Sequence, residues 1–154
     1  MMLKLQWLNC FWLLIPILAW NGVFSAKLAH PAFKLDEAVP GWILILENLL
    51  RIATMLLPLF MPLRWDTAQS KLGIAIYLLG LVVYFVSWIP LMVVPSSAWS
   101  NSPLGFLAPA YTPLLWLAGM GLIAGWWPYL VLSAAFVGVH LVHWSQIYVL
   151  AMGR

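Results

Sequence analysis

The sequence predicts an all-α integral membrane protein, a bundle of five transmembrane helices that forms a single domain over residues 1–154. Three observations lead to this prediction. Hydrophobic residues make up 65% of the chain and charged residues only 7%, whereas a soluble domain carries roughly 25% charged residues. Five apolar runs approach the ~20 residues that a helix needs to cross ~30 Å of hydrocarbon. The links between the runs are short, and none has the composition of a linker between domains.

The five predicted helices are Gln6–Ala26, Gly41–Pro62, Leu72–Val94, Phe106–Trp127 and Pro128–Leu150. The first run follows Lys4, an arrangement that a cleavable signal peptide also has. It is long for a signal peptide and contains three tryptophans, so we expect it to remain in the protein as a helix. Tryptophan and tyrosine cluster near the predicted helix ends, where side chains at a membrane interface are enriched.

Four links, two of them charged, separate the predicted helices. The first link, Lys27–Pro40, contains His30, Lys34, Asp36 and Glu37, and the second, Leu63–Lys71, contains Arg64, Asp66 and Lys71. Both links are expected to be loops in water. The third link, Pro95–Gly105, has no charge and is rich in the turn-forming residues Pro, Ser, Asn and Gly. The fourth, near Gly125–Pro128, is short enough to predict a tight helical hairpin.

The positive-inside rule does not orient this chain. With five crossings, one side receives Lys4, Arg64 and Lys71, and the other receives Lys27, Lys34 and Arg154. We expect the N-terminus to be cytoplasmic, because the uncharged third link then faces outward. The expected location is a bacterial-type plasma membrane, with membrane lipids as partners.

The fourth predicted helix has an unusual start. Thr112 followed by Pro113 has the form of an N-cap and a first-turn proline. A helix from Pro113 to Trp127 would be about 22 Å long at ~1.5 Å per residue, which is short for a crossing. The sequence therefore predicts a helix broken near Pro113, where Tyr111 and Thr112 would offer backbone donors to a ligand. The alternative is a continuous helix with a proline kink.

The second and fifth helices carry ionisable side chains inside their apolar runs. Glu47 and Arg51 are four residues apart, and His140 and His143 are three apart, so each pair lies on one helical face. A charge at mid-membrane costs about 2.5 kcal/mol or more, so such residues face protein or a watery cavity and are candidates for function. The alternative is that they only neutralise one another and fix helix packing.

Depth along alternating helices predicts that these residues meet. Arg51, Tyr84 and His140 are expected at the midplane, and Glu47, Ser87 and His143 roughly 6 Å to one side. Tyr77, Gly80, Tyr84 and Ser87 share a stripe on the third helix that should also face inward. We predict that Glu47 contacts His143, that Arg51 lies near Tyr84 or His140, and that a pocket walled by Trp88, Trp99 and Trp116 opens toward Pro95–Gly105.

Several function classes are disfavoured. The seven Lys and Arg are scattered singly, so no basic stripe suits a nucleic acid. Cys10 is the only cysteine, which excludes an internal disulfide and any metal site built on a pair of cysteines. The sequence contains none of four common catalytic or nucleotide-binding motifs: the nucleophile elbow, the dinucleotide fingerprint, the P-loop and H-E-x-x-H. No cofactor is expected.

Three classes of function remain open. The first is binding or transport of a small amphipathic or lipid-like molecule at a polar pocket, and homo-oligomerisation is plausible because one copy offers little room for a transport path. The residues expected to bind it are Glu47, Arg51, Tyr84, Ser87, Tyr111, Thr112, His140 and His143. The second is an intramembrane enzyme in which His140, His143 and Glu47 hold a metal or move protons. The third is an accessory subunit in which the same residues only stabilise packing.

Overall fold

The computed structural model describes residues 7–28, 35 and 37–152, and within them the regular elements are all helices. In chain order they are the 3₁₀ helix η1 (Cys10–Leu14), α1 (Ile15–Val23), α2 (Ser25–Leu28), α3 (Gly41–Leu56), the 3₁₀ helix η3 (Leu57–Phe60), α4 (Ala68–Val93), α5 (Pro103–Phe106), α6 (Ala108–Tyr111), α7 (Pro113–Ala124) and α8 (Trp127–Met152). Five residues to which the sequence assigned loop or orientation roles lie outside the described residues: Lys4, His30, Lys34, Asp36 and Arg154.

Three helices are long and apolar enough to cross a membrane. They are Gly41–Phe60, with 20 residues, and Ala68–Val93 and Trp127–Met152, with 26 residues each. Two other apolar stretches, Cys10–Val23 and Ala108–Ala124, are helical but shorter. The all-helical class is therefore confirmed, whereas the structure supports three of the five predicted crossings by length.

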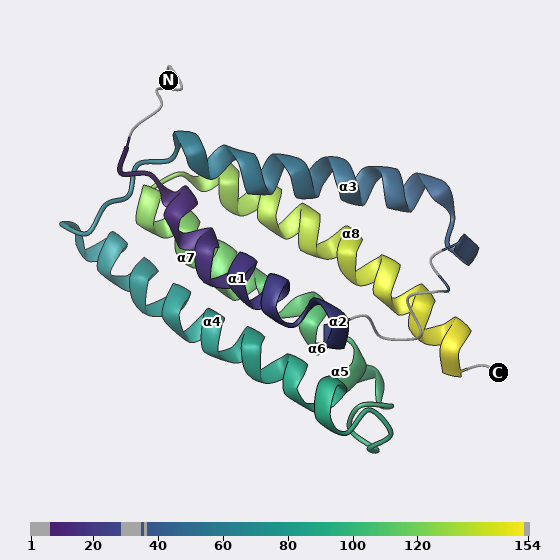
Figure 1. Ribbon diagram of the computed structural model, residues 1–154. Helices are drawn as coiled ribbons and strands as arrows, with labels where there is room; N and C mark the ends of the chain where they lie inside the picture. Colours follow the sequence, from purple (N-terminus) through teal and green to yellow (C-terminus); the bar gives the residue numbers. More distant parts are fainter. Residues whose placement is uncertain (1–6, 29–34, 36, 153–154) are drawn as a thin grey trace.

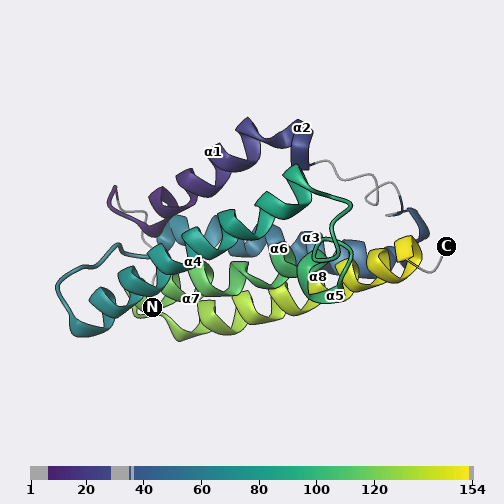
Figure 2. The same ribbon diagram turned by 90° about the horizontal axis from the view of Figure 1, so that it is seen from below.

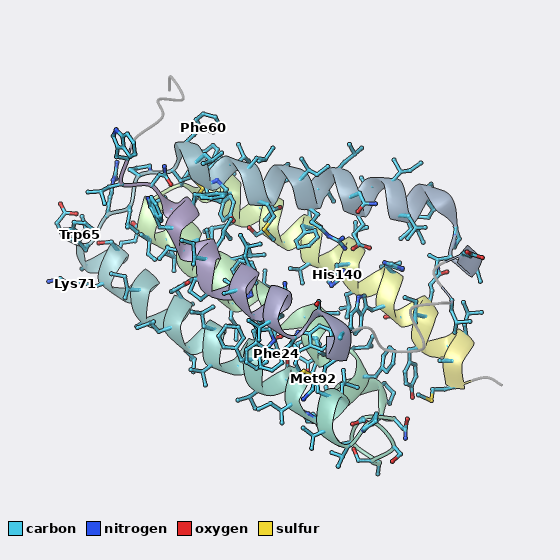
Figure 3. The ribbon with its side chains drawn as sticks, viewed as in Figure 1. Phe24, Phe60, Trp65, Lys71, Met92 and His140 are labelled. Atoms are coloured by element: carbon cyan, nitrogen blue, oxygen red, sulfur yellow. The ribbon has the colours of Figure 1, made fainter. Side chains whose placement is uncertain are left out.

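The chain runs back and forth along one axis (Figure 1). The start of the described chain pairs with the end of η3, because the Cys10 amide donates to the Met61 carbonyl oxygen at 2.8 Å. Trp65 and Lys71 lie at this end of the bundle beside the start of α4, and Phe60 lies at the same end beside α3 (Figure 3). At the opposite end, the Tyr148 hydroxyl near the end of α8 donates to the Asn101 carbonyl oxygen at 3.1 Å. The bundle thus places the start of η1 and the end of α8 at opposite ends.

Helices α4 and α7 approach closely because glycines lie between them. A Cβ added at Gly80 would lie 2.5 Å from the Trp116 backbone nitrogen, and one at Gly119 would lie 2.6 Å from the Tyr77 backbone nitrogen. Gly73 faces Ile123 in the same way, at 2.7 Å. Small residues that let backbones approach are typical of helix pairs in membranes. The glycines thus hold α4 and α7 in close backbone contact.

Helix α1 is attached to α4 by aromatic side chains. Figure 2 shows α1 on one side of the bundle, beyond α4 as seen from α8. The Tyr77 hydroxyl donates to the Leu13 carbonyl oxygen at 2.6 Å, and the Tyr84 hydroxyl donates to Asn21 Oδ1 at 3.3 Å. Trp20 stacks on Phe85 with ring centroids 4.5 Å apart. The inward direction predicted for Tyr77 and Tyr84 is confirmed, since both are buried.

A proline near the end of α3 explains a second tyrosine contact. In a regular α-helix the Thr54 carbonyl oxygen would accept from residue 58, but Pro58 has no N–H and the chain continues as η3. The Tyr129 hydroxyl on α8 donates to this carbonyl oxygen at 3.1 Å. The buried carbonyl therefore has a partner, and the same bond joins α3 to α8 near the start of α8.

The interruption predicted near Pro113 is present, but its chemistry differs from the prediction. Thr112 separates α6 from α7, and Leu107 separates α5 from α6. Thr112 has right-handed helical dihedral angles (φ −63°, ψ −27°) and makes no side-chain cap hydrogen bond, so its predicted N-cap role is wrong. The amides of Tyr111 and Thr112 donate to Leu107 and Ala108 carbonyl oxygens, so they are not available to a ligand. The helical path bends without exposing these donors.

Thr67 moves the start of α4 four residues before the predicted one. Its hydroxyl oxygen accepts from the Ser70 amide, and the Ser70 hydroxyl oxygen accepts from the Thr67 amide, both at 3.0 Å. This reciprocal capping box satisfies two amides that a helix start leaves without partners. Helix α4 consequently begins at Ala68 rather than at Leu72.

Large apolar side chains cover the outside of the bundle. On α3 and α4 the exposed ones include Ile45, Leu49, Ile52, Leu72, Leu78, Leu79 and Val82. A water-soluble protein rarely exposes so large an apolar surface, which here suits contact with lipid tails. Trp7, Trp42, Trp65, Trp99 and Trp127 are also exposed and lie near element ends, as interfacial tryptophans do.

Candidate functional site

Three basic side chains converge on one buried carboxylate between α3 and α8. Glu47 is 2% exposed and lies in the middle of α3. Its Oε1 contacts His140 Nδ1 at 2.9 Å, and its Oε2 contacts His143 Nδ1 at 2.5 Å. The Arg51 guanidinium also donates to Oε1. The predicted contact between Glu47 and His143 is therefore present, and His140 joins it.

Helical spacing explains why these groups meet. Residues four apart on α3 and three apart on α8 share a face, and α3 packs directly against α8. Figure 3 shows His140 near the middle of the bundle. The His140 ring stacks on Phe136 at 5.6 Å and meets Trp144 edge-on at 5.7 Å, so aromatic neighbours hold the imidazole in place. The sequence alone predicted both pairs because the two spacings match the helical repeat.

The burial of this cluster is uneven. The Arg51 side chain is 46% exposed, whereas the side chains of His140 and His143 are 13% and 8% exposed. An ionised carboxylate only accepts hydrogen bonds, so in that state both Nδ1 atoms carry protons. Glu47 then has three donors, which compensates for removing its charge from water. Arg51 is by far the most exposed of the four side chains.

A cavity of about 300 Å³ adjoins the cluster on its Arg51 and His140 side. It is lined by residues of α1, α3, α4, α6, α7 and α8, namely Ile17, Asn21, Arg51, Met55, Tyr84, Trp88, Pro109, Pro113, Trp116, Phe136, His140 and Trp144. Most of this wall is aromatic or aliphatic, and four side chains with strong polar groups, those of Asn21, Arg51, Tyr84 and His140, interrupt it. Arg51, Tyr84 and His140 all line this cavity.

The opening predicted for this pocket is wrong. Its lining contains no residue of Pro95–Gly105, and the nearest residues in sequence that belong to the wall are Trp88 and Pro109. Trp88 and Trp116 belong to the wall as expected, but Trp99 does not. Trp116 is 2% exposed, and its indole N–H has no hydrogen-bond partner among the described residues.

Ser87, Tyr111 and Thr112 lie at a different place from the other predicted binding residues. They line a separate groove of about 460 Å³ on the outer side of α4 and α6, together with Trp99. The Ser87 hydroxyl donates to the Tyr84 carbonyl oxygen at 2.6 Å and lies 3.3 Å from the Thr112 hydroxyl. The Tyr111 hydroxyl donates to the Leu104 carbonyl oxygen at 3.2 Å. Equal depth along the helices, which grouped Ser87 with Glu47 and His143, did not determine which side of the bundle Ser87 faces.

Sequence reasoning missed several residues of the cavity. Asn21 is the clearest, since it is the one amide side chain in the apolar run from Phe11 to Phe24 and could have been identified for that reason. Met55 and Phe136 gave no signal, because apolar residues on a helix look alike whether they face lipid, core or cavity.

Comparison with known proteins adds no assignment. No protein-family model, curated protein or solved structure matches this chain. The function must therefore be argued from the site itself.

Proposed function

We propose that this chain crosses the membrane five times and binds a small amphipathic molecule in the cavity beside Arg51 and His140. The observation that carries the proposal is the composition of the cavity wall, which combines a broad apolar surface with a few polar groups. Small-molecule sites have this composition and volumes of about 300–1,000 Å³. The two shorter helical stretches, Cys10–Val23 and Ala108–Ala124, run beside the long helices and support five crossings.

The wall defines the chemistry of the ligand. Trp88, Trp116 and Trp144 offer flat apolar surfaces that suit a ring or a short hydrocarbon segment. Arg51 has five N–H donors, and one of its terminal nitrogens donates to Glu47. The remaining N–H groups suit an acceptor such as a carbonyl, hydroxyl or phosphate oxygen. The cavity is too small for a whole phospholipid, and a longer tail would have to extend into the bilayer.

The exposure of Arg51 supports lateral entry from the membrane. A guanidinium at mid-bundle is costly in contact with lipid tails, and 46% of this side chain is exposed. A polar ligand head beside Arg51 would reduce that cost. A second copy of the chain packed against this surface would also remove Arg51 from contact with lipid tails. The oligomeric state is therefore measured in the same experiment.

Native mass spectrometry of the purified protein tests the proposal. Met55 lines the cavity, whereas its neighbour Leu56 is exposed, so Met55→Trp and Leu56→Trp form a matched pair. We expect the wild type and Leu56→Trp to retain an additional small mass, and Met55→Trp to lose it. Arg51→Gln should also lose it, and thermal unfolding of all variants separates loss of the ligand from loss of the fold.

Two results would overturn this proposal. One is an additional mass that Met55→Trp and Leu56→Trp retain equally, which places the ligand outside the cavity. The other is the absence of any retained molecule from the wild type, both in detergent and after reconstitution with lipid extracted from the source membrane.

A further inference from the structure

Glu47, His140 and His143 have the composition of a metal site as well as that of a hydrogen-bonded cluster. One ligand atom from each residue lies within 4.8 Å of those from the other two. We propose that these three side chains bind one divalent first-row transition-metal ion of the Zn²⁺ type. The site lies beside the cavity, but metal binding does not require the amphipathic molecule and is tested without it.

The geometry needs only small side-chain movements to accept an ion. Tetrahedral Zn²⁺ with bonds of ~2.1 Å places its ligand atoms about 3.4 Å apart. The His140 Nδ1–Oε1 contact of 2.9 Å and the His143 Nδ1–Oε2 contact of 2.5 Å would each have to lengthen by about 1 Å or less. The ligand atoms of the group lie within 4.8 Å of one another, so the widest pair would have to close by about 1.4 Å at most. Ligands three residues apart on one helix, completed by a carboxylate from another, also occur in metal-binding helical bundles.

The protons of the cluster can be conserved when a metal binds. A neutral imidazole that donates to the Glu47 carboxylate carries its proton on Nδ1, the nitrogen that faces Glu47 in both rings. Coordination through Nδ1 requires that proton to leave this nitrogen, and a neutral imidazole can carry it on Nε2 instead. Two neutral imidazoles and one carboxylate then face the ion, a donor set that suits Zn²⁺.

Charge distinguishes the ligands from Arg51. A divalent ion and one carboxylate leave a net charge of +1, and the nearby guanidinium adds a second positive charge. Because the cluster is largely buried, this repulsion is weakly screened. Arg51 should therefore weaken metal binding, and its replacement should strengthen it. Since His140 lines the cavity, a fourth ligand such as hydroxide or an anionic group would come from that side.

The experiment uses the full chain in detergent, freed of metal by a chelator and titrated with Zn²⁺. We expect about one ion per chain, and we expect Co²⁺ in its place to give the visible absorption of a tetrahedral site. His140→Ala, His143→Ala and Glu47→Gln should each lower Zn²⁺ affinity by at least about tenfold. Arg51→Gln should raise it, and His30→Ala is the control for adventitious binding by histidine.

Two outcomes contradict the site. Wild-type protein that shows neither saturable Zn²⁺ binding nor a Co²⁺ spectrum overturns the proposal, even if every variant is unstable. Zn²⁺ binding that His30→Ala removes and His143→Ala preserves also overturns it. If Met55→Trp blocks the small molecule while Zn²⁺ binding remains, the proposed function and the metal site stand independently.

Discussion

At the contact of α4 with α7, Gly80 and Gly119 bring two backbones together, and a single added Cβ would lie 2.5 to 2.6 Å from a backbone nitrogen. At the contact of α3 with α8, the central residues are instead Glu47, His140 and His143, and a cavity of about 300 Å³ adjoins them. One interface leaves no room for a methyl group. The other contains polar side chains and space.

The difference separates what stabilises the bundle from what is available for chemistry. Helices in lipid gain little from apolar contact alone, so close packing at glycines is an effective way to hold them together. A buried ion pair, by contrast, contributes little to stability relative to apolar residues of the same size, because desolvation offsets the attraction. Packing therefore explains the α4–α7 interface, whereas the polar cluster at α3–α8 requires another reason.

The largest effect is expected from a substitution at the close interface. Gly119→Leu should abolish the folded protein, because its side chain would meet the Tyr77 backbone and Cβ at 2.6 to 2.7 Å and no flexible group there can move. Gly138→Leu on α8 is the control, since nothing lies within 4 Å of a Cβ at Gly138. Size-exclusion profiles and circular dichroism in detergent would show the loss. Equal profiles for both variants would mean that α4 and α7 are not closely packed.

A smaller but substantial loss is expected from the polar interface. Glu47→Leu leaves two histidine N–H groups and Arg51 without their shared acceptor, and should lower the free energy of unfolding by about 2–3 kcal/mol. This estimate allows for the 46% exposure of Arg51. Adding Arg51→Leu should restore part of the loss, since the unpaired charge is then absent. Reversible unfolding in mixed micelles measures both.

If the double variant were less stable than Glu47→Leu alone, Arg51 would stabilise the bundle through contacts other than Glu47. That result would weaken the contrast between the two interfaces, because the polar side chains would then hold helices together by themselves.

The same contrast shows how far the sequence alone could be interpreted. Glu47, Arg51, His140 and His143 were paired correctly because helical spacing and depth both follow from residue number. Ser87, Tyr111 and Thr112 were not placed correctly, because depth does not specify which side of a helix faces which neighbour. The face that each helix turns toward its neighbour is determined by the packing of helix pairs, here by glycines. The role of such a glycine can be recognised only when its partner helix is known.

The N-cap role predicted for Thr112 is wrong for the same kind of reason, although the predicted interruption of the helix is present. The pair Thr112–Pro113 has the local pattern of a helix start, but Thr112 stays helical and its hydroxyl lies 3.3 Å from that of Ser87 on α4. A tertiary contact replaced the local cap. Thr67, whose partner Ser70 is three residues away, makes the expected kind of cap because both groups are local.

An intermediate effect is expected where a tyrosine replaces a missing helix hydrogen bond. Tyr129→Phe leaves the Thr54 carbonyl oxygen without its donor, since Pro58 cannot supply one, and should cost about 1–1.5 kcal/mol. Tyr111→Phe is the control, because the hydroxyl of Tyr111 bonds at an exposed site and should change stability by less than about 0.5 kcal/mol. Thermal unfolding of both variants measures the difference, and equal midpoints would remove the role assigned to Tyr129.

The smallest effect on stability, and the one most informative about the cavity, is expected from Tyr84→Phe. The Tyr84 hydroxyl makes a 3.3 Å hydrogen bond to Asn21, and such bonds between membrane helices contribute about 0.6 kcal/mol. Because Tyr84 also lines the cavity, removal of its hydroxyl should lower retention of the small molecule more than it lowers the unfolding temperature. Tyr77→Phe removes a shorter bond, 2.6 Å to the Leu13 carbonyl oxygen, at a site outside the cavity lining. It should therefore lower stability at least as much and leave ligand retention unchanged. If the two variants affected the ligand equally, Tyr84 would act only by holding α1 in place, and the polar wall of the cavity would consist of Asn21, Arg51 and His140.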